Sequence, residues 1–301
     1  MNEYLIRHRT LYRYEAPALE SQNLHCLLPA SFPGQQRSAW TLTIRPEPEW
    51  NYSWVDVFGN QRGAFSLCSE HEELEVEMLA RVTREAPMQL SSALPWEQVI
   101  LPGGAAWSQA SPMMREFGCA SPLLPVQRRP GFEADDCFEP GLPVETALLR
   151  FMKRVFDVFR YDPGATDTFT PLKEVYEKKA GVCQDFAHAA IAELRRRGFS
   201  AGYVSGYLET LPPPGQEKLR GADATHAWYA VYVPGAGWMH FDPTNNVVPG
   251  VQHLITGWGR DYSDVAPVKG VVLGGGEHQV EVQVDVWRWP DQVPEEYRSM
   301  G

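Results

Sequence analysis

The 301-residue sequence is poor in positive charge and contains no long hydrophobic run. It has 27 Lys and Arg against 38 Asp and Glu, a formal net charge of −11, which argues against nucleic acid or an anionic lipid surface as a partner. No run approaches the roughly 18 apolar residues that span a bilayer. The start of the chain, with Glu3, Arg7 and Arg9, does not resemble a signal peptide. We therefore expect a cytoplasmic protein without a membrane segment, although its oligomeric state stays open.

Paired cysteines and histidine pairs are also missing. The five cysteines include no C-x-x-C pair, and their odd number and wide spacing fit neither a disulfide scaffold nor a zinc ribbon. No two histidines have the H-x-x-x-H spacing that places two ligands on one helical face. We expect a reducing compartment, no metal and no other cofactor. The five cysteines are Cys26, Cys68, Cys119, Cys137 and Cys183.

What is present is an ordinary globular composition, 44% hydrophobic and 22% charged, arranged in four segments. Residues 1–85 read as an antiparallel β region, with a hairpin turn near Phe58 to Gln61. Residues 86–142 read as a Pro- and Gly-rich connector with short helices, residues 143–260 as a core of helices and strands, and residues 261–301 as a loop and a return β-strand. This order predicts an α+β fold.

The core segment shows two periodicities. Apolar residues three and four apart predict helices over 143–160 and 171–178, and a third from Cys183 that ends at Gly198. Alternation then predicts strands in "AGYVSGYLET", "THAWYAVYV" and "GWMHFD". A Pro-rich loop over 211–223 separates the first two strands, and we expect it to form one wall of a cleft.

Cys183 stands at the predicted start of the third helix. Free backbone N–H groups and the helix dipole stabilise a thiolate there, which favours a nucleophile over an inert buried thiol. Such a nucleophile needs a base and a group that orients the base. His226 begins one strand of a predicted hairpin and Asp242 ends the other, so the two side chains are expected either opposite each other or as diagonal neighbours on one face. The sequence leaves the register open.

Two other histidines compete with His226 for the role of base. His188 lies about 140° round the helix from Cys183, so we interpret it as a packing residue. His240 shares a strand face with Asp242 and is the only serious rival. We prefer His226 because of its position in the hairpin. The remaining histidines, His253 among them, stand among ordinary polar neighbours.

These motifs together resemble a known family. The G-x-C-x-D-x-A start of the helix, the "GY" of the next strand, and then "HAW" and "DPT" resemble the transglutaminase-like core, in particular its bacterial branch of proposed cysteine proteases. The core resemblance covers about 157–246, and both flanks are similar to this branch as well. It implies a papain-like core with Cys183 as nucleophile, His226 as general base and acid, and Asp242 orienting the imidazole.

The resemblance also suggests substrate-binding residues, each with a structural alternative. Asp185 either contacts substrate or serves as a first-turn acid favoured by the helix dipole. Tyr207 and Trp228 either line an acyl cleft or pack in the core, and Trp258 is a further cleft candidate. The sequence thus predicts a cysteine-dependent enzyme that transfers the acyl group of a peptide or protein amide to water or to an amine. The alternatives are a non-catalytic peptide- or protein-binding module and, less favoured, a metal-dependent hydrolase that a chelator would inactivate.

Overall fold

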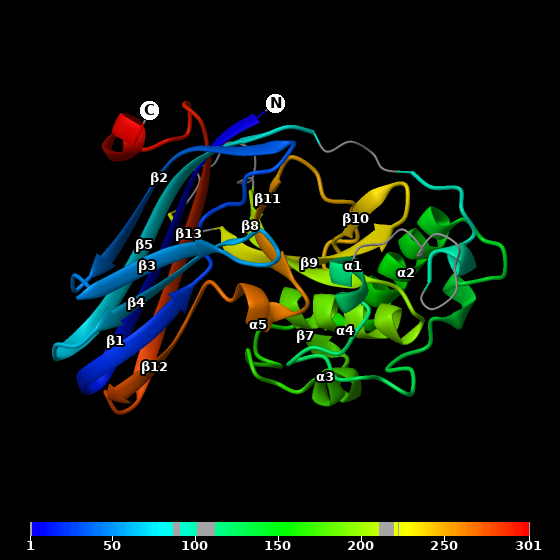
Figure 1. Ribbon diagram of the computed structural model, residues 1–301, viewed down its shortest axis with the longest axis horizontal. Helices are drawn as coiled ribbons and strands as arrows, with labels where there is room; N and C mark the ends of the chain where they lie inside the picture. The colour runs from blue at the N-terminus through cyan, green and yellow to red at the C-terminus, as the bar shows by residue number, and fades with distance from the viewer. Residues whose placement is uncertain (1, 87–90, 101–111, 211–219, 222, 301) are drawn as a thin grey trace.

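Two large β-sheets and a layer of helices form most of the computed structural model (Figure 1). It describes residues 2–86, 91–100, 112–210, 220–221 and 223–300. Residues 87–90 and 101–111 of the predicted connector lie outside the described residues. So do residues 211–219 and 222 of the predicted Pro-rich loop, which leaves its role as a cleft wall a prediction.

The N-terminal sheet has seven strands and is built around one long strand, β1. The path β2-β5-β1-β4-β3 runs through it, and β12 and β13 pair with β1 as well. The predicted hairpin near 58–61 is confirmed, because β3 pairs with β4 across this turn. The strands are β1 (Asn2–His25), β2 (Gln35–Arg45), β3 (Trp50–Val55), β4 (Gln61–Leu67), β5 (His71–Arg84), β12 (Val268–Gly274) and β13 (His278–Arg288).

The end of the chain supplies two strands to this sheet, where the sequence pattern predicts one. β13 pairs with residues 4–14 of β1, and β12 pairs with residues 18–25. The alternation from Gln279 to Trp287 predicts β13 correctly. The pattern of β12 is interrupted by Lys269 and Gly270, so only its pairing with β1 reveals it as a strand. Both ends of the chain therefore meet in one sheet (Figure 1).

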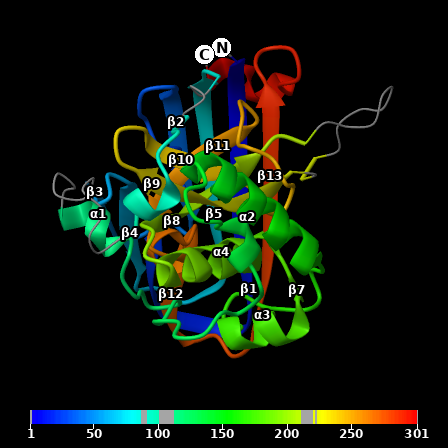
Figure 2. The same ribbon diagram turned by 90° about the vertical axis from the view of Figure 1, so that its right-hand side faces the viewer.

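The second sheet is antiparallel, with the strand order β10-β9-β8-β11. Its first three strands follow the predicted pattern, whereas β11 is a strand that the pattern does not predict. Figure 2 shows this sheet between the helices, which lie in front, and the N-terminal sheet behind. The strands are β8 (Ala201–Leu208), β9 (Ala224–Val233), β10 (Gly237–Phe241) and β11 (His253–Gly259).

The helices confirm the predicted periodicities. In α2 the expected apolar face, Ala147, Leu148, Phe151 and Val155, is buried, and α4 ends before Gly198, whose φ is +93°. A short parallel pair, β6 (Arg160–Tyr161) and β7 (Ala180–Gly181), leads into α4. The α-helices are α1 (Pro112–Glu116), α2 (Val144–Val158), α3 (Leu172–Lys178), α4 (Cys183–Arg196) and α5 (Tyr262–Val265), and the 3₁₀ turns are Trp96–Gln98, Asp135–Cys137 and Glu295–Met300.

The helix α4 is buried on all sides, from Asp185 to Leu194, because it lies between the second sheet and the other helices. The sequence places three arginines in its last turn, and one of them, Arg195, is drawn inward. Its guanidinium donates hydrogen bonds to the backbone carbonyls of Phe117, Ala201 and Arg260. These bonds fix the C-terminal end of α4 to three separate segments.

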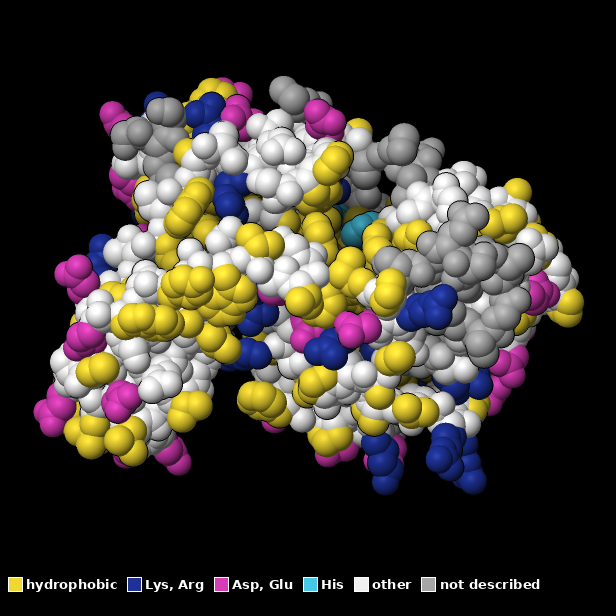
Figure 3. Space-filling view, in the orientation of Figure 1, with side chains coloured by type: hydrophobic (Ala, Val, Ile, Leu, Met, Phe, Trp, Pro, Cys, Tyr) yellow, Lys and Arg dark blue, Asp and Glu magenta, His cyan; other side chains and the backbone are white. Residues whose placement is uncertain are grey.

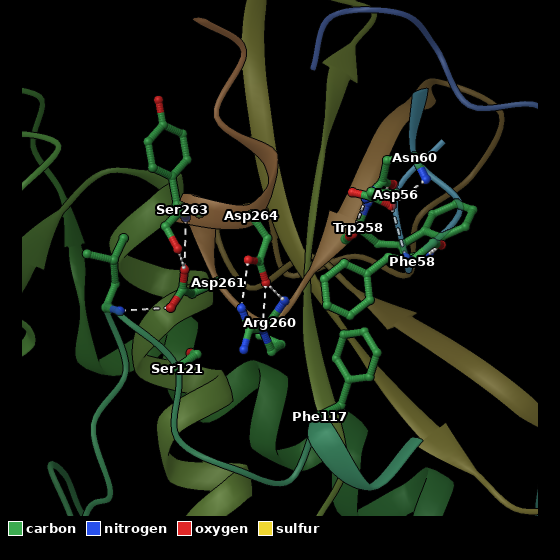
Figure 4. Close-up of polar contacts among 12 residues, drawn as sticks. Asp56, Phe58, Asn60, Phe117, Ser121, Trp258, Arg260, Asp261, Ser263 and Asp264 are labelled. Atoms are coloured by element: carbon green, nitrogen blue, oxygen red, sulfur yellow. Dashed lines mark hydrogen bonds and ion pairs between the residues drawn. The ribbon is translucent and has the colours of Figure 1, made fainter. Parts of the chain in front are cut away.

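The two faces of the second sheet carry different cores. Tyr203, Tyr229 and Val231 pack against the helices, whereas Val204 and Trp228 pack on the opposite face. The N-terminal sheet is attached on that side through the turn between β3 and β4. Asn60 of this turn donates from Nδ2 to the carbonyl of Trp258 in β11 at 2.7 Å and accepts the Trp258 backbone N–H at 2.9 Å (Figure 4). The N-terminal sheet is thus hydrogen bonded to β11 of the second sheet.

The strand β3 is an edge strand with unusually exposed aromatic side chains. Trp50 and Tyr52 are 54% and 58% exposed, and their rings stack in a row with the ring of Trp54. Figure 3 shows hydrophobic side chains gathered over this part of the molecule.

Among the helices that the structure describes, none is long and apolar enough to cross a membrane.

Candidate active site

Cys183 is the first residue of α4 and is partly exposed. Its position is fixed by Asp185, whose Oδ2 accepts the backbone N–H of Val182 at 2.8 Å and the hydroxyl of Thr166 at 2.6 Å. Gly181 is required here, because a Cβ at this position would lie 2.3 Å from the same carboxylate oxygen. The Gly and Asp of the G-x-C-x-D motif thus serve the turn that presents the thiol at a helix N-terminus, where a thiolate is stabilised.

Asp185 is therefore placed as a helix-capping residue. Only 2% of it is exposed, and both its acceptor contacts lie inside the protein. Burial raises the pKa of its carboxyl, and the hydrogen bonds from Thr166 and Val182 oppose this rise. At 2% exposure, Asp185 has little surface to offer to a substrate.

His226 and Asp242 meet through the register of the β9–β10 hairpin. Gly237 pairs with Val233, so the loop has three residues, Pro234 to Ala236. Continued by one residue, this register sets Asp242 opposite Trp228 and diagonal to His226, the second of the two arrangements that the spacing allows. Nε2 of His226 and Oδ2 of Asp242 are 2.7 Å apart. Both side chains are buried, Asp242 completely.

The thiol of Cys183, at the start of α4, interacts with His226. Because Nε2 is engaged with Asp242, Nδ1 is the ring nitrogen that remains for the thiol. Burial by itself lowers the pKa of His226, but the hydrogen bonds with Asp242 and Cys183 outweigh it and raise the pKa to about 10. The site therefore favours an imidazolium beside the cysteine.

The carboxylate of Asp242 is held by several donors at once. Oδ1 accepts the backbone N–H groups of Thr244 and Asn245, at 3.0 and 3.2 Å. Oδ2 accepts from Nδ2 of Asn245 at 2.7 Å and from Nε2 of His253 at 3.1 Å, besides His226. Burial raises the pKa of Asp242, but the hydrogen bonds from His226 and His253 lower it well below its ordinary value. Asp242 is thus an ionised acceptor.

Asn245 and His253 are two site residues that the sequence reasoning missed. A signal existed for Asn245, because an Asp followed by Pro, Thr and Asn is typical of a turn in which the carboxylate accepts backbone N–H groups. No local signal existed for His253. It begins β11, which reaches Asp242 only because β11 pairs with β8, and β8 with β9.

Trp228 and Tyr207 both lie in the interior. The Trp228 ring is completely buried behind His226, with ring centroids 5.9 Å apart, and its Nε1 donates to Nδ1 of His240 at 3.1 Å. Gly206 makes room for it, since a Cβ there would lie 2.7 Å from the indole ring. Tyr207 is 1% exposed and its hydroxyl lies 2.9 Å from Nδ1 of His8. Neither ring presents a surface to a cleft.

Trp258 and the competing histidines are each held by a partner in the fold. Trp258 donates from Nε1 to the carbonyl of Phe58 at 2.8 Å, at the junction with the N-terminal sheet (Figure 4). His240 accepts the indole N–H of Trp228, and burial lowers its pKa to about 4. His188 accepts the backbone N–H of Tyr262 through Nε2 at 3.2 Å, and burial lowers its pKa to about 4 as well. Each has a structural partner.

Among the described residues, one group has the composition of a metal site. The ligand atoms of His226, Asp242 and His253 lie within 4.8 Å of one another. These same atoms are joined to each other by the hydrogen bonds to Oδ2 of Asp242. The group is accounted for as a hydrogen-bonded network.

The raised pKa of His226 leads to a prediction about stability. In the unfolded chain His226 loses its proton near pH 6.5, and in the folded protein near pH 10. The stabilisation that it contributes is therefore complete below about pH 6.5 and is lost as the pH rises toward 10. We expect the difference in free energy of unfolding between the parent and a His226→Gln variant, measured by urea denaturation, to be larger at about pH 6 than at about pH 9.5. A difference in free energy of unfolding that does not change with pH would contradict this prediction.

Comparison with known proteins agrees with this architecture. The model of the bacterial transglutaminase-like N-terminal region matches residues 4–83, and that of the transglutaminase-like superfamily matches residues 134–243. An uncharacterized protein of Mycobacterium tuberculosis is 34% identical over 295 residues, which are 95% of this chain and 92% of that protein. A protein-glutamine gamma-glutamyltransferase of Pseudomonas aeruginosa is 31% identical over 112 residues, 37% of this chain and 17% of that enzyme.

A solved structure shares the whole fold. The crystal structure of a proposed cysteine protease from Cytophaga hutchinsonii superimposes with a TM-score of 0.75 at 19% identity, over 96% of this chain and 91% of that one. The predicted α+β fold with a papain-like, transglutaminase-like core and an N-terminal β region is thereby confirmed. The chain belongs to the transglutaminase-like superfamily, in the bacterial group that carries the transglutaminase-like N-terminal region.

Proposed function

We propose that this protein is a cysteine-dependent acyl-transfer enzyme that acts on amide bonds of a peptide or protein. In this proposal Cys183 is the nucleophile, His226 the general base and acid, and Asp242 the residue that orients the imidazole. The transglutaminase-like fold supports a cysteine enzyme in general. The proposal needs neither metal nor cofactor, and it needs a reducing compartment such as the cytoplasm, because a nucleophile held in a disulfide is inactive.

One observation carries the proposal: a thiol at a helix start interacts with an imidazole whose Nε2 lies 2.7 Å from Oδ2 of a buried carboxylate. These are the parts that nucleophilic catalysis requires. Because Asp242 is ionised and can only accept, Nε2 of His226 carries a proton and Nδ1 faces the thiol. The imidazole is thereby held in the tautomer that takes up the thiol proton.

In this reaction Cys183 carries the acyl group from the donor amide to the acceptor. The Cys183 thiolate attacks the amide carbonyl carbon, and the oxyanion that forms is stabilised by the backbone N–H of Cys183, which as the first N–H of α4 has no acceptor within the helix. The C–N bond breaks as His226 gives its proton to the departing amine, which leaves a thioester on Cys183. His226 next takes a proton from the acceptor, which attacks the thioester, and the acid or new amide leaves as the thiol is restored.

The acceptor decides between two outcomes of the same chemistry. Water makes the enzyme a protease or amidase, which is the outcome we favour. An amine makes it a transglutaminase, the activity named for the Pseudomonas aeruginosa relative. Incubating a substrate peptide with and without a primary amine, and weighing the products by mass spectrometry, separates the two.

The reactivity of the thiols tests the proposal without knowledge of the substrate. A thiolate–imidazolium pair is ionised near pH 6, where an ordinary thiol is ionised to well under 1%. We expect limiting iodoacetamide to modify Cys183 about 10- to 100-fold faster than Cys68 and Cys119, which are exposed and free, as read by mass mapping.

A His226→Gln variant is the control, because it keeps Cys183 in place and removes the imidazolium. Its Cys183 is expected to react about as fast as Cys68 and Cys119. If Cys183 of the parent reacts no faster than these two cysteines, the proposed function is wrong, and a binding module on the same fold becomes the better interpretation.

A further inference from the structure

Asp242 is shared between two histidines, only one of which has a role in the proposed reaction. His253 lies at the start of β11 and points its Nε2 at Oδ2 of Asp242, 3.1 Å away, the same oxygen that His226 contacts at 2.7 Å. His253 is only 4% exposed. Two imidazoles thus converge on one carboxylate oxygen inside the protein.

The tautomer of His253 is fixed by its other nitrogen. The backbone N–H of Gly250 donates to Nδ1 at 3.3 Å, so Nδ1 is an acceptor and carries no proton. The single proton of the neutral ring is then on Nε2, from which it is donated to Asp242. His253 acts as a fixed donor, whereas Nδ1 of His226 is free to exchange a proton with the thiol.

The surroundings hold the His253 ring in this orientation. The edge of the Trp228 indole packs against it, with ring centroids 5.2 Å apart and planes at 85°. The titratable groups that face it are the His226 ring, 6.0 Å away between centroids, the carboxylate of Asp242 and, within electrostatic range, His240 of β10. The indole N–H of Trp228 donates to His240. The same indole packs against the rings of His226 and His253, the two histidines that contact Asp242.

We propose that His253 is a positioning residue, which fixes the Asp242 carboxylate in the rotation that presents Oδ2 to His226. Oδ1 is bound by two backbone N–H groups of one turn, and the donors on Oδ2 determine how far the carboxylate tilts about that anchor. His253 reaches Oδ2 from β11, whereas His226 lies in β9 and Asn245 in the turn after β10. This inference rests on the proposed function, because positioning matters through the reactivity of Cys183.

Replacing His253 by glutamine or by asparagine distinguishes its hydrogen bond to Asp242 from its other contributions. Glutamine places its amide nitrogen near the position of Nε2, whereas asparagine places it near Nδ1, out of reach of Asp242. We expect His253→Gln to retain kcat and the alkylation rate of Cys183 at about pH 6 within about 3-fold. We expect His253→Asn to lower both by about 10-fold, the effect of losing a buried hydrogen bond to a charged group, with KM little changed.

A third variant, His253→Phe, keeps a ring against Trp228 but has no donor, and it should behave as His253→Asn does. Thermal unfolding identifies any variant that does not fold, and in that case the comparison of His253→Gln with the remaining variant decides. If His253→Gln is as impaired as the variants without a donor, or if none of the three is impaired, the inference is overturned. Failure of the proposed function is distinct, because then Cys183 of the parent itself is no more reactive than Cys68 and Cys119.

Discussion

Replacing Cys183 by alanine is expected to reduce amide turnover by about 10⁴-fold or more, because no other group in the site can form the thioester. The substrate is first found by profiling the parent protein against a library of peptides and isopeptides. Initial rates on that substrate measure the effect, and intact-mass spectrometry of the parent should show an acyl adduct that the variant lacks. The fold should be unaffected, since Cys183 is only partly buried at the end of a helix.

Cys119→Ala is the matched control, as Cys119 is an exposed free thiol outside the site. It should keep the parental rate. Full activity in the Cys183→Ala protein would exclude a cysteine mechanism at this position. Ligand binding that survives alkylation of Cys183, without any product, would favour the non-catalytic module instead.

The second large effect is expected for Asp242→Asn, with a loss of about 10³- to 10⁴-fold in kcat. Both carboxylate oxygens accept hydrogen bonds, so the amide NH₂ of asparagine meets a donor whichever way it is turned. If it faces His226, Nε2 must become the acceptor, and the ring proton moves to Nδ1, toward Cys183. The imidazole then cannot take the thiol proton. If it faces the turn, the backbone N–H groups of Thr244 and Asn245 lose their acceptor.

Asp261→Asn distinguishes this effect from general destabilisation. Asp261 is also fully buried, and its two oxygens accept the backbone N–H groups of Ser263 and Leu123, each at 2.8 Å (Figure 4). We expect both variants to lower the midpoint of thermal unfolding, but only Asp242→Asn to lower kcat at a temperature where both are folded. Equal losses of kcat would mean that Asp242 contributes no more than stability.

Local patterns in the sequence predicted the elements that carry the candidate site. The apolar periodicity and Gly198 delimit α4, so Cys183 falls at a helix N-terminus. The alternation of the two strands after it predicts the hairpin that brings His226 and Asp242 within reach of each other. These features depend on residues close together in the chain, which is why periodicity and spacing were sufficient.

Whether each aromatic side chain lines the candidate site or packs in the core could be decided only from the structure. Trp228 and Tyr207 stand beside motif residues, yet both rings are buried in cores that the second sheet shares with the N-terminal region. Alternation along a strand shows which residues share a face, but it does not show what packs against that face. The strand β12 was missed for a related reason, since its partner β1 lies some 250 residues earlier in the chain.

By itself, then, the sequence determined the α+β class, the helix that begins at Cys183 and the pair of residues, His226 and Asp242, that can meet in a hairpin. The tertiary structure decided the register of that hairpin and the burial of Trp228. It also decided the convergence of His253 on Asp242. The physical reason is how far apart the interacting residues lie in the sequence. Helix starts and turns are determined by neighbouring residues. The position of β11 depends on its pairing with strands elsewhere in the sheet, which no local sequence pattern indicates.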